Sequence, residues 1–353
     1  MTRPPSAAEL LEGKPLPGGW TIENRVQLPD DHSGGRFSIG YFATDGSGRL
    51  GFVKALDYTM ILERSDDPAR DMQNATVAFN AERELLAKCA HLSRIVQVID
   101  AGTIRVPEAL PSVVSYILFE RAHGDAADAR GEHGANEFLP LLNLAHHAGV
   151  ALSQLHSIGA AHQDLKPSNV LTWRLQQGLE GKLGDLGVAF LPGRPAPHDD
   201  AAIPGDCFHA PPEQVYGHSD LLPLDQRRYA ADMFMLGDLL AFLLTGVNYN
   251  GILALSLDRS QRWQSWGGTF REVLPALIDA HGRALTRLQE TLHTDIAALV
   301  VDVMNELCYP DPSLRCDPVA RGHNQNAYAL RRYVTKLNLI CYRARIAVAH
   351  SAS

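Results

Sequence analysis

The sequence predicts an α+β fold of two lobes, a small β-rich lobe followed by a larger, mostly helical one. Its 353 residues are too many for one small domain. The first 120 residues alternate apolar and polar side chains, as strands do, around one helical segment. After residue 138, long apolar runs follow helical spacing instead. With 45% apolar and 20% charged residues, the chain can bury a core in each lobe.

The first lobe is expected to span residues 20–122, preceded by a flexible leader over the Pro- and Gly-rich residues 1–19. Residues 58–75 are polar and are expected to connect strands to a helix over 73–92. A DGSG turn marks a hairpin. The lobe therefore has five expected strands, namely WTIENRVQL, RFSIGYFAT, LGFVKALD, RIVQVIDAGTI and SVVSYILFE.

The second lobe is expected to span residues 123–320, with a helical extension of that lobe over 321–353. A long apolar helix over 139–159 ends at a glycine. It is followed by the polar stretch HQDLKPSNVL (162–171), a hairpin, a loop rich in Pro and Gly, and further helices. The extension carries basic pieces, RRYVTK and YRAR, which we expect to face solvent.

The composition excludes several classes of function. A net charge of −8 and a pI near 6 argue against a nucleic-acid partner. The five cysteines are scattered without CxxC spacing, which favours reduced thiols in the cytoplasm over disulfides or a metal site. No stretch reaches the 18 or more apolar residues of a membrane span, and the N-terminus has no apolar signal core. A cytoplasmic protein is expected.

The motif HQDLKPSN (162–169) resembles the catalytic loop H-R-D-x-K-x-x-N of Hanks-type serine/threonine protein kinases. The resemblance implies that Asp164 accepts the proton of the substrate hydroxyl, that Lys166 neutralises the transferred phosphoryl group, and that Asn169 holds Mg²⁺. Downstream, GDLGVA (184–189) resembles the D-F-G element, which makes Asp185 the second Mg²⁺ ligand. The cofactors implied are ATP and Mg²⁺, and the implied fold is the bilobal kinase fold.

Upstream motifs of the same family supply the nucleotide-binding residues. FVKALD (52–57) resembles the V-A-I-K strand, so Lys54 should anchor phosphates, and Glu82, rather than the neighbouring Glu84, should pair with it. Phe119 corresponds to the gatekeeper. The resemblance further implies main-chain contacts to adenine and a glycine-rich loop with an aromatic tip, although the spacing of that loop departs from G-x-G-x-x-G; the residues concerned are Glu120, Ala122, Gly34, Gly35, Phe37 and Gly40.

Three further segments resemble structural anchors of the family. HAPPEQ (209–214) resembles the A-P-E element and YPDPSLR (309–315) the D-P-x-x-R segment, so Glu213 and Arg315 should form an ion pair. ADMFMLG (231–237) resembles the D-x-W-x-x-G helix start, and Asp232 should accept hydrogen bonds from the catalytic-loop backbone. The motifs occur in the order typical of the family.

Two substitutions depart from the family pattern. Gln163 stands where the family carries the Arg that binds a phosphorylated activation loop, and residues 186–213 contain no Ser, Thr or Tyr. We therefore expect a kinase of the non-RD type that phosphorylation of this loop does not switch on, and that another element or a regulatory partner controls. Asp206 replaces a Thr that links Asp164 to Lys166 in the family, and it should either pair with Lys166 or disturb it.

The leading interpretation is an ATP- and Mg²⁺-dependent serine/threonine protein kinase, bacterial by its Arg- and Ala-rich composition, acting on a protein substrate of unknown identity. One alternative is a pseudokinase that serves as a binding or scaffold module, which the atypical glycine-rich loop favours. The other is a kinase-like phosphotransferase acting on a small molecule, which the Glu213 and Arg315 motifs disfavour.

Overall fold

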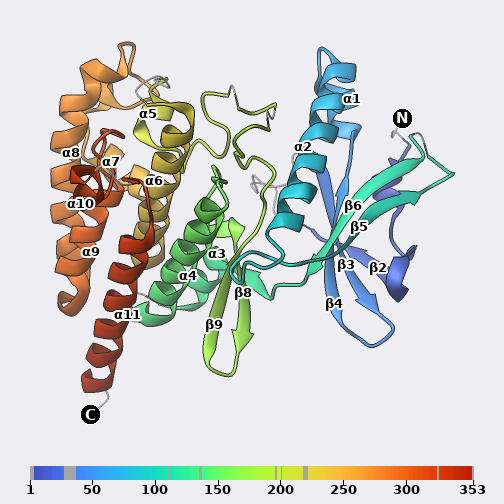
Figure 1. Cartoon of the computed structure of the whole chain (residues 1–353), viewed down its shortest axis with the longest axis horizontal. Coiled ribbons are helices and arrows are strands. Elements are labelled where there is room, and N and C mark those ends of the chain that lie inside the picture. The colour runs from blue at the N-terminus through green and yellow to red at the C-terminus, as the bar shows by residue number, and fades with distance from the viewer. Residues whose placement is uncertain are drawn as a thin grey trace. The chain divides into compact units, whose positions relative to one another are not determined.

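The computed structural model describes residues 4–27, 37–109, 111–134, 137–194, 197–199, 201–217, 222–323 and 326–351. The chain divides into two compact units, one formed by Met1–His91 with Ile95–Ala122 and the other by Leu92–Arg94 with His123–Ser353. The division after Ala122 falls where the two lobes were expected to meet. The first unit is β-rich and the second mostly helical, as Figure 1 shows for each.

The first unit is a six-stranded antiparallel sheet in the order β1-β2-β3-β4-β6-β5. In its middle strand, Lys54 lies opposite Gly40 on one side and Ile117 on the other. Ala7, Ala8 and Leu11 belong to the core cluster on the apolar face of the sheet. The elements are β1 (Pro15–Leu16), β2 (Trp20–Arg25), β3 (Ser38–Asp45), β4 (Leu50–Leu56), α1 (Thr59–Arg64), α2 (Pro68–Lys88), β5 (Val98–Arg105) and β6 (Val113–Glu120).

The segment expected to be a flexible leader is part of this unit, so that prediction is wrong for residues 4–19. It forms η1 (Ala7–Leu10), β1 and η2 (Pro17–Gly19), and Ser6 and Glu9 cap η1 reciprocally. Leu11 is fully buried in the core cluster of the sheet. The hydroxyl of Tyr41 donates to the carbonyl of Ala8 at 2.6 Å. Small apolar residues among the prolines and glycines thus supply a sixth strand and part of the core.

Residues 58–75 are also more helical than expected, because α1 lies within them and α2 begins at Pro68. The side chain of Asp67 accepts from the backbone N–H of Arg70, and proline occupies the first helical position, where its missing N–H costs no bond. Asp67 and Pro68 therefore mark the start of α2, although the polar composition of this stretch suggested a connection.

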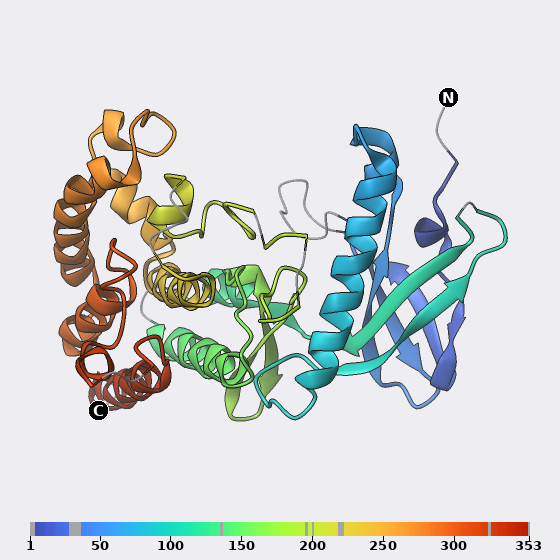
Figure 2. The ribbon, with the colours of Figure 1, turned by 45° about the horizontal axis from the view of Figure 1, so that its top comes forward.

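The second unit is built on two long, largely buried helices, α4 and α6, which lie side by side in Figure 2. A small sheet in the order β7-β8-β9 packs against α4. The elements are β7 (Gly124–Asp125), α3 (Ala126–Glu132), α4 (Phe138–Ser157), η3 (Pro167–Asn169), β8 (Val170–Leu175), β9 (Gly178–Leu183), α5 (Pro212–Val215), α6 (Leu224–Thr245), α7 (Tyr249–Leu255), η4 (Arg259–Gln261), α8 (Phe270–Thr291), α9 (Thr294–Leu307), α10 (Pro318–Gly322) and α11 (Arg331–Ser351).

The C-terminal extension forms α11, which packs along α4 and α9. Tyr333 is fully buried, whereas Arg343 is exposed. Two of the basic residues do not simply face solvent, because Arg332 and Lys336 contact Oε1 of Glu306 at 2.9 and 2.8 Å. The helix therefore closes the second unit with both apolar and ionic contacts.

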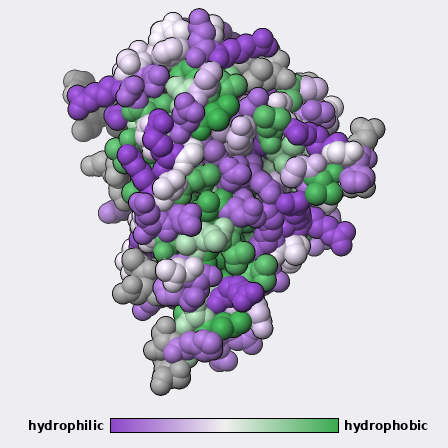
Figure 3. All heavy atoms as spheres, turned by 90° about the vertical axis from the view of Figure 1, so that its left-hand side faces the viewer, coloured by the Kyte–Doolittle hydropathy of each residue, from purple (hydrophilic) through white to green (hydrophobic). Residues whose placement is uncertain are grey.

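The surface on the α8 and α9 side of the second unit carries apolar residues in separate patches among polar ones (Figure 3). Among the described residues, no single helix combines the length and apolar character needed to cross a membrane. Helices α6 and α7 meet that requirement only as a pair, and they are bent by 83° relative to each other.

Candidate active site

The polar stretch 162–169 lies between α4 and β8, and a buried histidine fixes its course. Nδ1 of His162 accepts from the backbone N–H of Asp164 at 3.1 Å, and Nε2 lies 3.0 Å from the carbonyl oxygen of Gly184. Both contacts are satisfied when the proton resides on Nε2. His162 therefore ties this loop to the residue that precedes Asp185.

Asp232 of α6 holds the same loop through its backbone, as the sequence motif of Asp232 predicts. Its carboxylate accepts the backbone N–H groups of His162 (2.8 Å) and Gln163 (2.9 Å), and it also contacts Nε2 of His156 at 2.8 Å. Gln163 and Asp185 are the described non-glycine residues with positive φ, at 69° and 53°. Such conformations cost on the order of 1–3 kcal/mol each and persist where surrounding contacts impose them, often at functional sites.

The carboxylate of Asp164 is oriented at both oxygens. Oδ1 accepts from the backbone N–H of Asp206 at 2.7 Å, and Oδ2 accepts from Nδ2 of Asn169 at 3.0 Å. Oδ2 also lies 3.3 Å from Nζ of Lys166. The three residues that the sequence assigns to catalysis and metal binding in this loop are therefore in direct contact.

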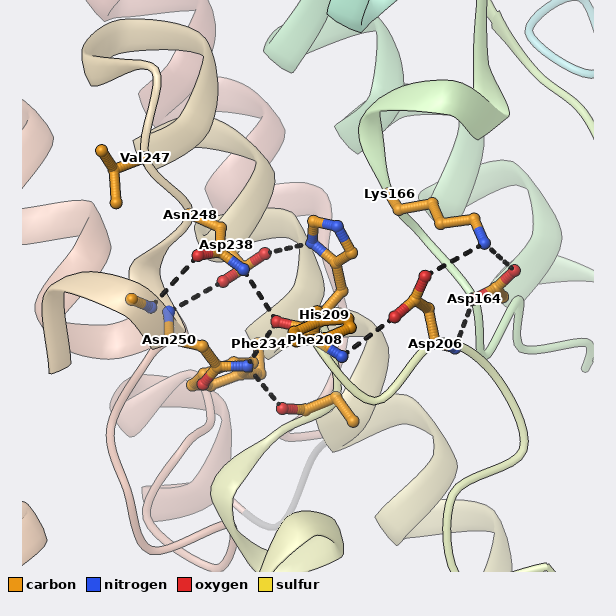
Figure 4. A network of polar contacts seen from close by, with 12 residues as sticks. Asp164, Lys166, Asp206, Phe208, His209, Phe234, Asp238, Val247, Asn248 and Asn250 are labelled. Atoms are coloured by element: carbon orange, nitrogen blue, oxygen red, sulfur yellow. Dashed lines mark hydrogen bonds and ion pairs between the residues drawn. The ribbon is translucent and has the colours of Figure 1, made fainter. Parts of the chain in front are cut away.

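Asp206 pairs with Lys166, which is the first of the two outcomes expected for this substitution. Its carboxylate lies 3.4 Å from Nζ of Lys166, and Figure 4 shows Lys166 between the carboxylates of Asp164 and Asp206. The approach requires glycine at 205, because a Cβ there would lie 2.5 Å from both Oδ1 of Asp164 and the carbonyl oxygen of Gln163.

Asn169 and Asp185 are brought together by the backbone, since the N–H of Gly184 donates to the carbonyl of Asn169 at 2.9 Å. Nδ2 of Asn169 also donates to the Asp164 carbonyl at 2.7 Å, which turns its Oδ1 away from Asp164. The amide oxygen of Asn169 and the half-buried carboxylate of Asp185 are of the oxygen-ligand type that Mg²⁺ prefers. Within the described part of the chain, no three His, Cys, Asp or Glu side chains cluster as a protein-only metal cage.

A second polar network holds the loop that follows Asp206 (Figure 4). Nδ1 of His209 lies 2.7 Å from Oδ2 of Asp238, and the side chains of Asn248 and Asn250 donate to the carbonyl of Phe208 at 2.8 and 3.1 Å. Burial lowers the pKa of His209, but the hydrogen bond and charge of Asp238, with the charge of Asp206, outweigh it and raise the pKa.

Sequence motifs do not identify His209 and Asp238 as partners, because 29 residues separate them in the chain. The one available signal is an aspartate in the otherwise apolar run MFMLGDLLAFLLTG, since a buried charge needs a partner. The network fixes the backbone around Phe208, whose side chain is 65% exposed.

The predicted pair of Glu213 and Arg315 is present and buried. Nη1 and Nη2 of Arg315 each donate to one carboxylate oxygen of Glu213 at 2.8 Å. The guanidinium also donates to the backbone carbonyls of Tyr309, Ala230 and Pro310. This fork-to-fork arrangement joins α5 to the segment 309–315 and to α6.

In the first unit, Lys54 of β4 and Glu82 of α2 form the predicted ion pair. Nζ of Lys54 lies 2.9 Å from both carboxylate oxygens of Glu82. Glu82 is 3% exposed, whereas Glu84 lies on the exposed side of the helix. The choice between the two glutamates made from the sequence is confirmed for this contact.

The glycine-rich segment is described only in part, because Gly34 and Gly35 lie outside the described residues. Phe37 precedes β3 and is 40% exposed. Gly40 lies within β3 rather than in a loop, and a Cβ there would come within 2.9 Å of the Phe52 ring. The expectation that Gly40 belongs to the glycine-rich loop is therefore wrong, because Gly40 lies in β3 and packs closely against the Phe52 ring.

The residues predicted to contact adenine lie at the end of β6. Phe119 is buried, with its ring centroid 6.5 Å from that of Phe52. The backbone N–H of Glu120 donates to the carbonyl of Gln97 at 3.0 Å, so this donor is already used within the unit. Ala122 is half-buried and follows the strand.

Comparison with known proteins supports this assembly of motifs. Residues 59–320 match the family described as the protein kinase domain, which is more than half of the chain. A probable serine/threonine-protein kinase of Clostridium perfringens is 25% identical over 214 residues, which is 58% of this chain and 28% of that protein. One of Corynebacterium efficiens is 29% identical over 231 residues, which is 64% of this chain and 32% of that protein.

A human relative is similar over a shorter stretch. MAP kinase-activated protein kinase 2 of Homo sapiens is 28% identical over 163 residues, which is 45% of this chain and 37% of that protein. The chain spans about a third of the length of the curated relatives it matches.

Proposed function

Because the chain belongs to the protein kinase family, we propose that it transfers the γ-phosphoryl group of ATP to Ser or Thr hydroxyls of a protein substrate. The observation that carries the proposal is the contact of Asp164, Lys166 and Asn169 within one loop, with both oxygens of Asp164 held in place. Phosphoryl transfer demands positioned groups and positive charge around a highly charged transition state.

In the proposed reaction, Asp164 orients the substrate hydroxyl and accepts its proton. The ammonium of Lys166 stabilises charge on the phosphoryl group in transit. Asn169 and Asp185 would hold Mg²⁺, which neutralises the phosphate oxygens when bound. Because Asp206 shares Lys166, the reacting phosphoryl group must compete with a carboxylate for this cation.

Residues of the first unit are proposed to bind the nucleotide. Lys54, held by Glu82, would contact the phosphates. Phe119, Glu120 and Ala122 would contact adenine through apolar and main-chain groups. Main-chain amides of Gly34, Gly35 and Phe37 would contribute to phosphate binding.

The proposed enzyme does not depend on phosphorylation of its activation loop. Residues 186–213 contain no hydroxyl side chain. Gln163 carries no charge with which to bind a phosphate dianion, and its amide is fully buried. Control by another element or by a partner protein remains compatible with both facts.

A pseudokinase is the second candidate, and the Asp206–Lys166 pair is the observation that favours it. A carboxylate beside Lys166 reduces the positive charge available to ATP phosphates. The complete set of Lys54, Asp164, Lys166, Asn169 and Asp185 supports the enzyme instead. The Glu213–Arg315 anchor supports a protein substrate over a small molecule.

The test is transfer from γ-labelled ATP with Mg²⁺, using the purified chain and generic protein substrates. Asp164→Ala and Asp185→Asn should each abolish labelling, and the exposed Asp258→Asn should retain it as a matched control. Transfer that survives Asp164→Ala would overturn the assigned chemistry. ATP binding that requires Lys54 but gives no transfer with any substrate would favour the pseudokinase.

A further inference from the structure

The first turns of α6 carry a buried arginine that contacts both loops of the candidate active site. Arg228 is 3% exposed, one helical turn before Asp232. Asp232 holds the backbone of the catalytic loop. Arg228 reaches in two directions from the same helix, toward Gln163 and toward Asp199.

The contact with Gln163 is reciprocal. Nη1 of Arg228 donates to Oε1 of Gln163 at 3.2 Å, and Nε2 of Gln163 donates to the backbone carbonyl of Arg228 at 2.8 Å. Nε2 also lies 3.3 Å from Oδ1 of Asp232. Gln163 immediately precedes Asp164 in the chain. These contacts therefore hold the residue next to the candidate catalytic base.

The second contact reaches the loop after Asp185. Nη2 of Arg228 donates to the backbone carbonyl of Asp199. The neighbouring His198 lies with Nε2 3.4 Å from the carbonyl of Ala189, so residues 198–199 are held from two sides. Farther along the same loop, Asp206 donates its N–H to Asp164. The loop is thus fixed at Asp199 by α6 and at Asp206 by the catalytic base.

A guanidinium suits this position because it presents several donors in a planar fork. Burying a charged group is costly unless strong hydrogen bonds replace its hydration. The side-chain oxygen of Gln163 and the main-chain oxygen of Asp199 supply such acceptors from two different loops. Neither acceptor is a phosphate, and both belong to the unmodified chain.

We propose that Arg228 is a positioning residue for phosphoryl transfer, which clamps the loop 184–206 to Gln163 so that Asp206 meets Asp164 without any modification of that loop. The inference rests on the proposed function and identifies how the same site is regulated. The clamp is formed in the unmodified chain. Arg228 acts through Gln163 and Asp206 and does not touch the reacting atoms.

The test compares Arg228→Gln and Arg228→Lys with Arg227→Gln, which removes the same charge from the same turn of α6. Three kinds of measurement are made on the whole chain: hydrogen exchange across the non-proline residues of 197–206, kcat and KM for ATP, and Tm. A purely structural arginine would lower Tm and leave the other quantities of the folded variant unchanged. A positioning arginine changes local exchange and kcat together.

For Arg228→Gln we expect exchange at 197–206 to accelerate at least tenfold and kcat to fall about ten- to a hundredfold, with KM for ATP within about twofold. Lysine keeps the positive charge but not the planar fork of donors. The exchange rate and kcat of Arg228→Lys should therefore lie between those of the wild type and those of Arg228→Gln. Arg227→Gln should resemble the wild type. Unchanged exchange and kcat in a folded Arg228→Gln protein would overturn the proposal.

If Arg228→Gln fails to fold, Gln163→Met tests the same clamp, because it removes the three side-chain hydrogen bonds of Gln163, two with Arg228 and one with Asp232, at nearly constant volume. The same acceleration and loss of kcat are expected, and wild-type values would overturn the proposal. Should the wild type show no transfer with any substrate, the proposed function fails. The exchange measurement would then still decide whether Arg228 holds the loop.

Discussion

The backbone N–H of Asp206 donates a 2.7 Å hydrogen bond to Oδ1 of Asp164, across 42 residues of chain. The Asp206 side chain turns from there toward Lys166, at 3.4 Å. A single residue of the later loop therefore orients the candidate base through its main chain and competes for the candidate cation through its carboxylate.

The two roles of Asp206 separate in the variant Asp206→Asn, which keeps the backbone donor and removes the negative charge beside Lys166. We expect kcat to rise about three- to tenfold and KM for ATP to fall, because more of the Lys166 charge is available to phosphate. Steady-state kinetics with varied ATP measure both. A lower kcat would instead mean that the carboxylate is needed to hold Lys166 in place.

Removing the partner of Lys54 should cost activity without unfolding the protein. Glu82→Gln removes the buried counter-charge that positions the ammonium of Lys54, so we expect kcat/KM to fall about a hundredfold. Glu84→Gln is the matched control on the exposed side of α2 and should behave as the wild type. Equal effects of the two substitutions would refute the role assigned to Glu82.

The pair of Glu213 and Arg315 should contribute strongly to stability. Glu213→Gln leaves a fully buried guanidinium without its carboxylate, and we expect a loss of about 3–5 kcal/mol in the free energy of unfolding. Urea denaturation measures it. Arg174→Gln breaks the exposed pair with Glu132 and should cost less than about 1 kcal/mol. A similarly small loss for Glu213→Gln would contradict the prediction.

Acid should destabilise the second unit through His281. Burial lowers the pKa of His281 to about 4, from an ordinary value of 6.5. The folded chain keeps the ring neutral, between the hydroxyl of Tyr249 at 2.6 Å and Oδ1 of Asn305 at 3.2 Å. The neutral ring therefore contributes to the free energy of unfolding above pH 6.5. As the pH falls toward 4, we expect this free energy to decrease by about 3 kcal/mol.

The measurement is the free energy of unfolding between pH 4 and 7 for His281→Gln and the wild type. The variant lacks the titrating ring, so its stability should fall less steeply with acid. The exposed His91→Gln is the control and should keep the wild-type slope. Parallel curves for wild type and His281→Gln would show that this ring does not govern the acid response.

Motifs predicted the contacts whose partners occupy fixed places in a family pattern. Lys54 with Glu82, Glu213 with Arg315, and the hydrogen bonds to Asp232 are of this kind. The bilobal architecture followed from the change of hydrophobic period along the chain. These motifs predict contacts because the residue type and its position in the motif together specify the partner.

Contacts particular to this chain could not be predicted in this way. Arg228 reads locally as one more charged residue at the start of a helix, and its partners come from two distant loops. Gly40 was assigned to the glycine-rich loop by its resemblance to the family, although the strand register places it opposite Lys54. Local composition also misassigned residues 4–19, whose apolar residues are few but mostly buried, namely Ala7, Ala8, Leu11 and Leu16.

The placement of residues 4–19 bears on how the chain tolerates shortening. Leu11 and Leu16 cover an apolar area shared with Trp20 and Val106, and β1 shields the edge of β2. A recombinant fragment that starts at Trp20 would present this area and an unprotected strand edge to solvent, two features that promote aggregation. A protease that trims the N-terminus would therefore inactivate the protein by precipitation, with every residue of the catalytic loop still in place.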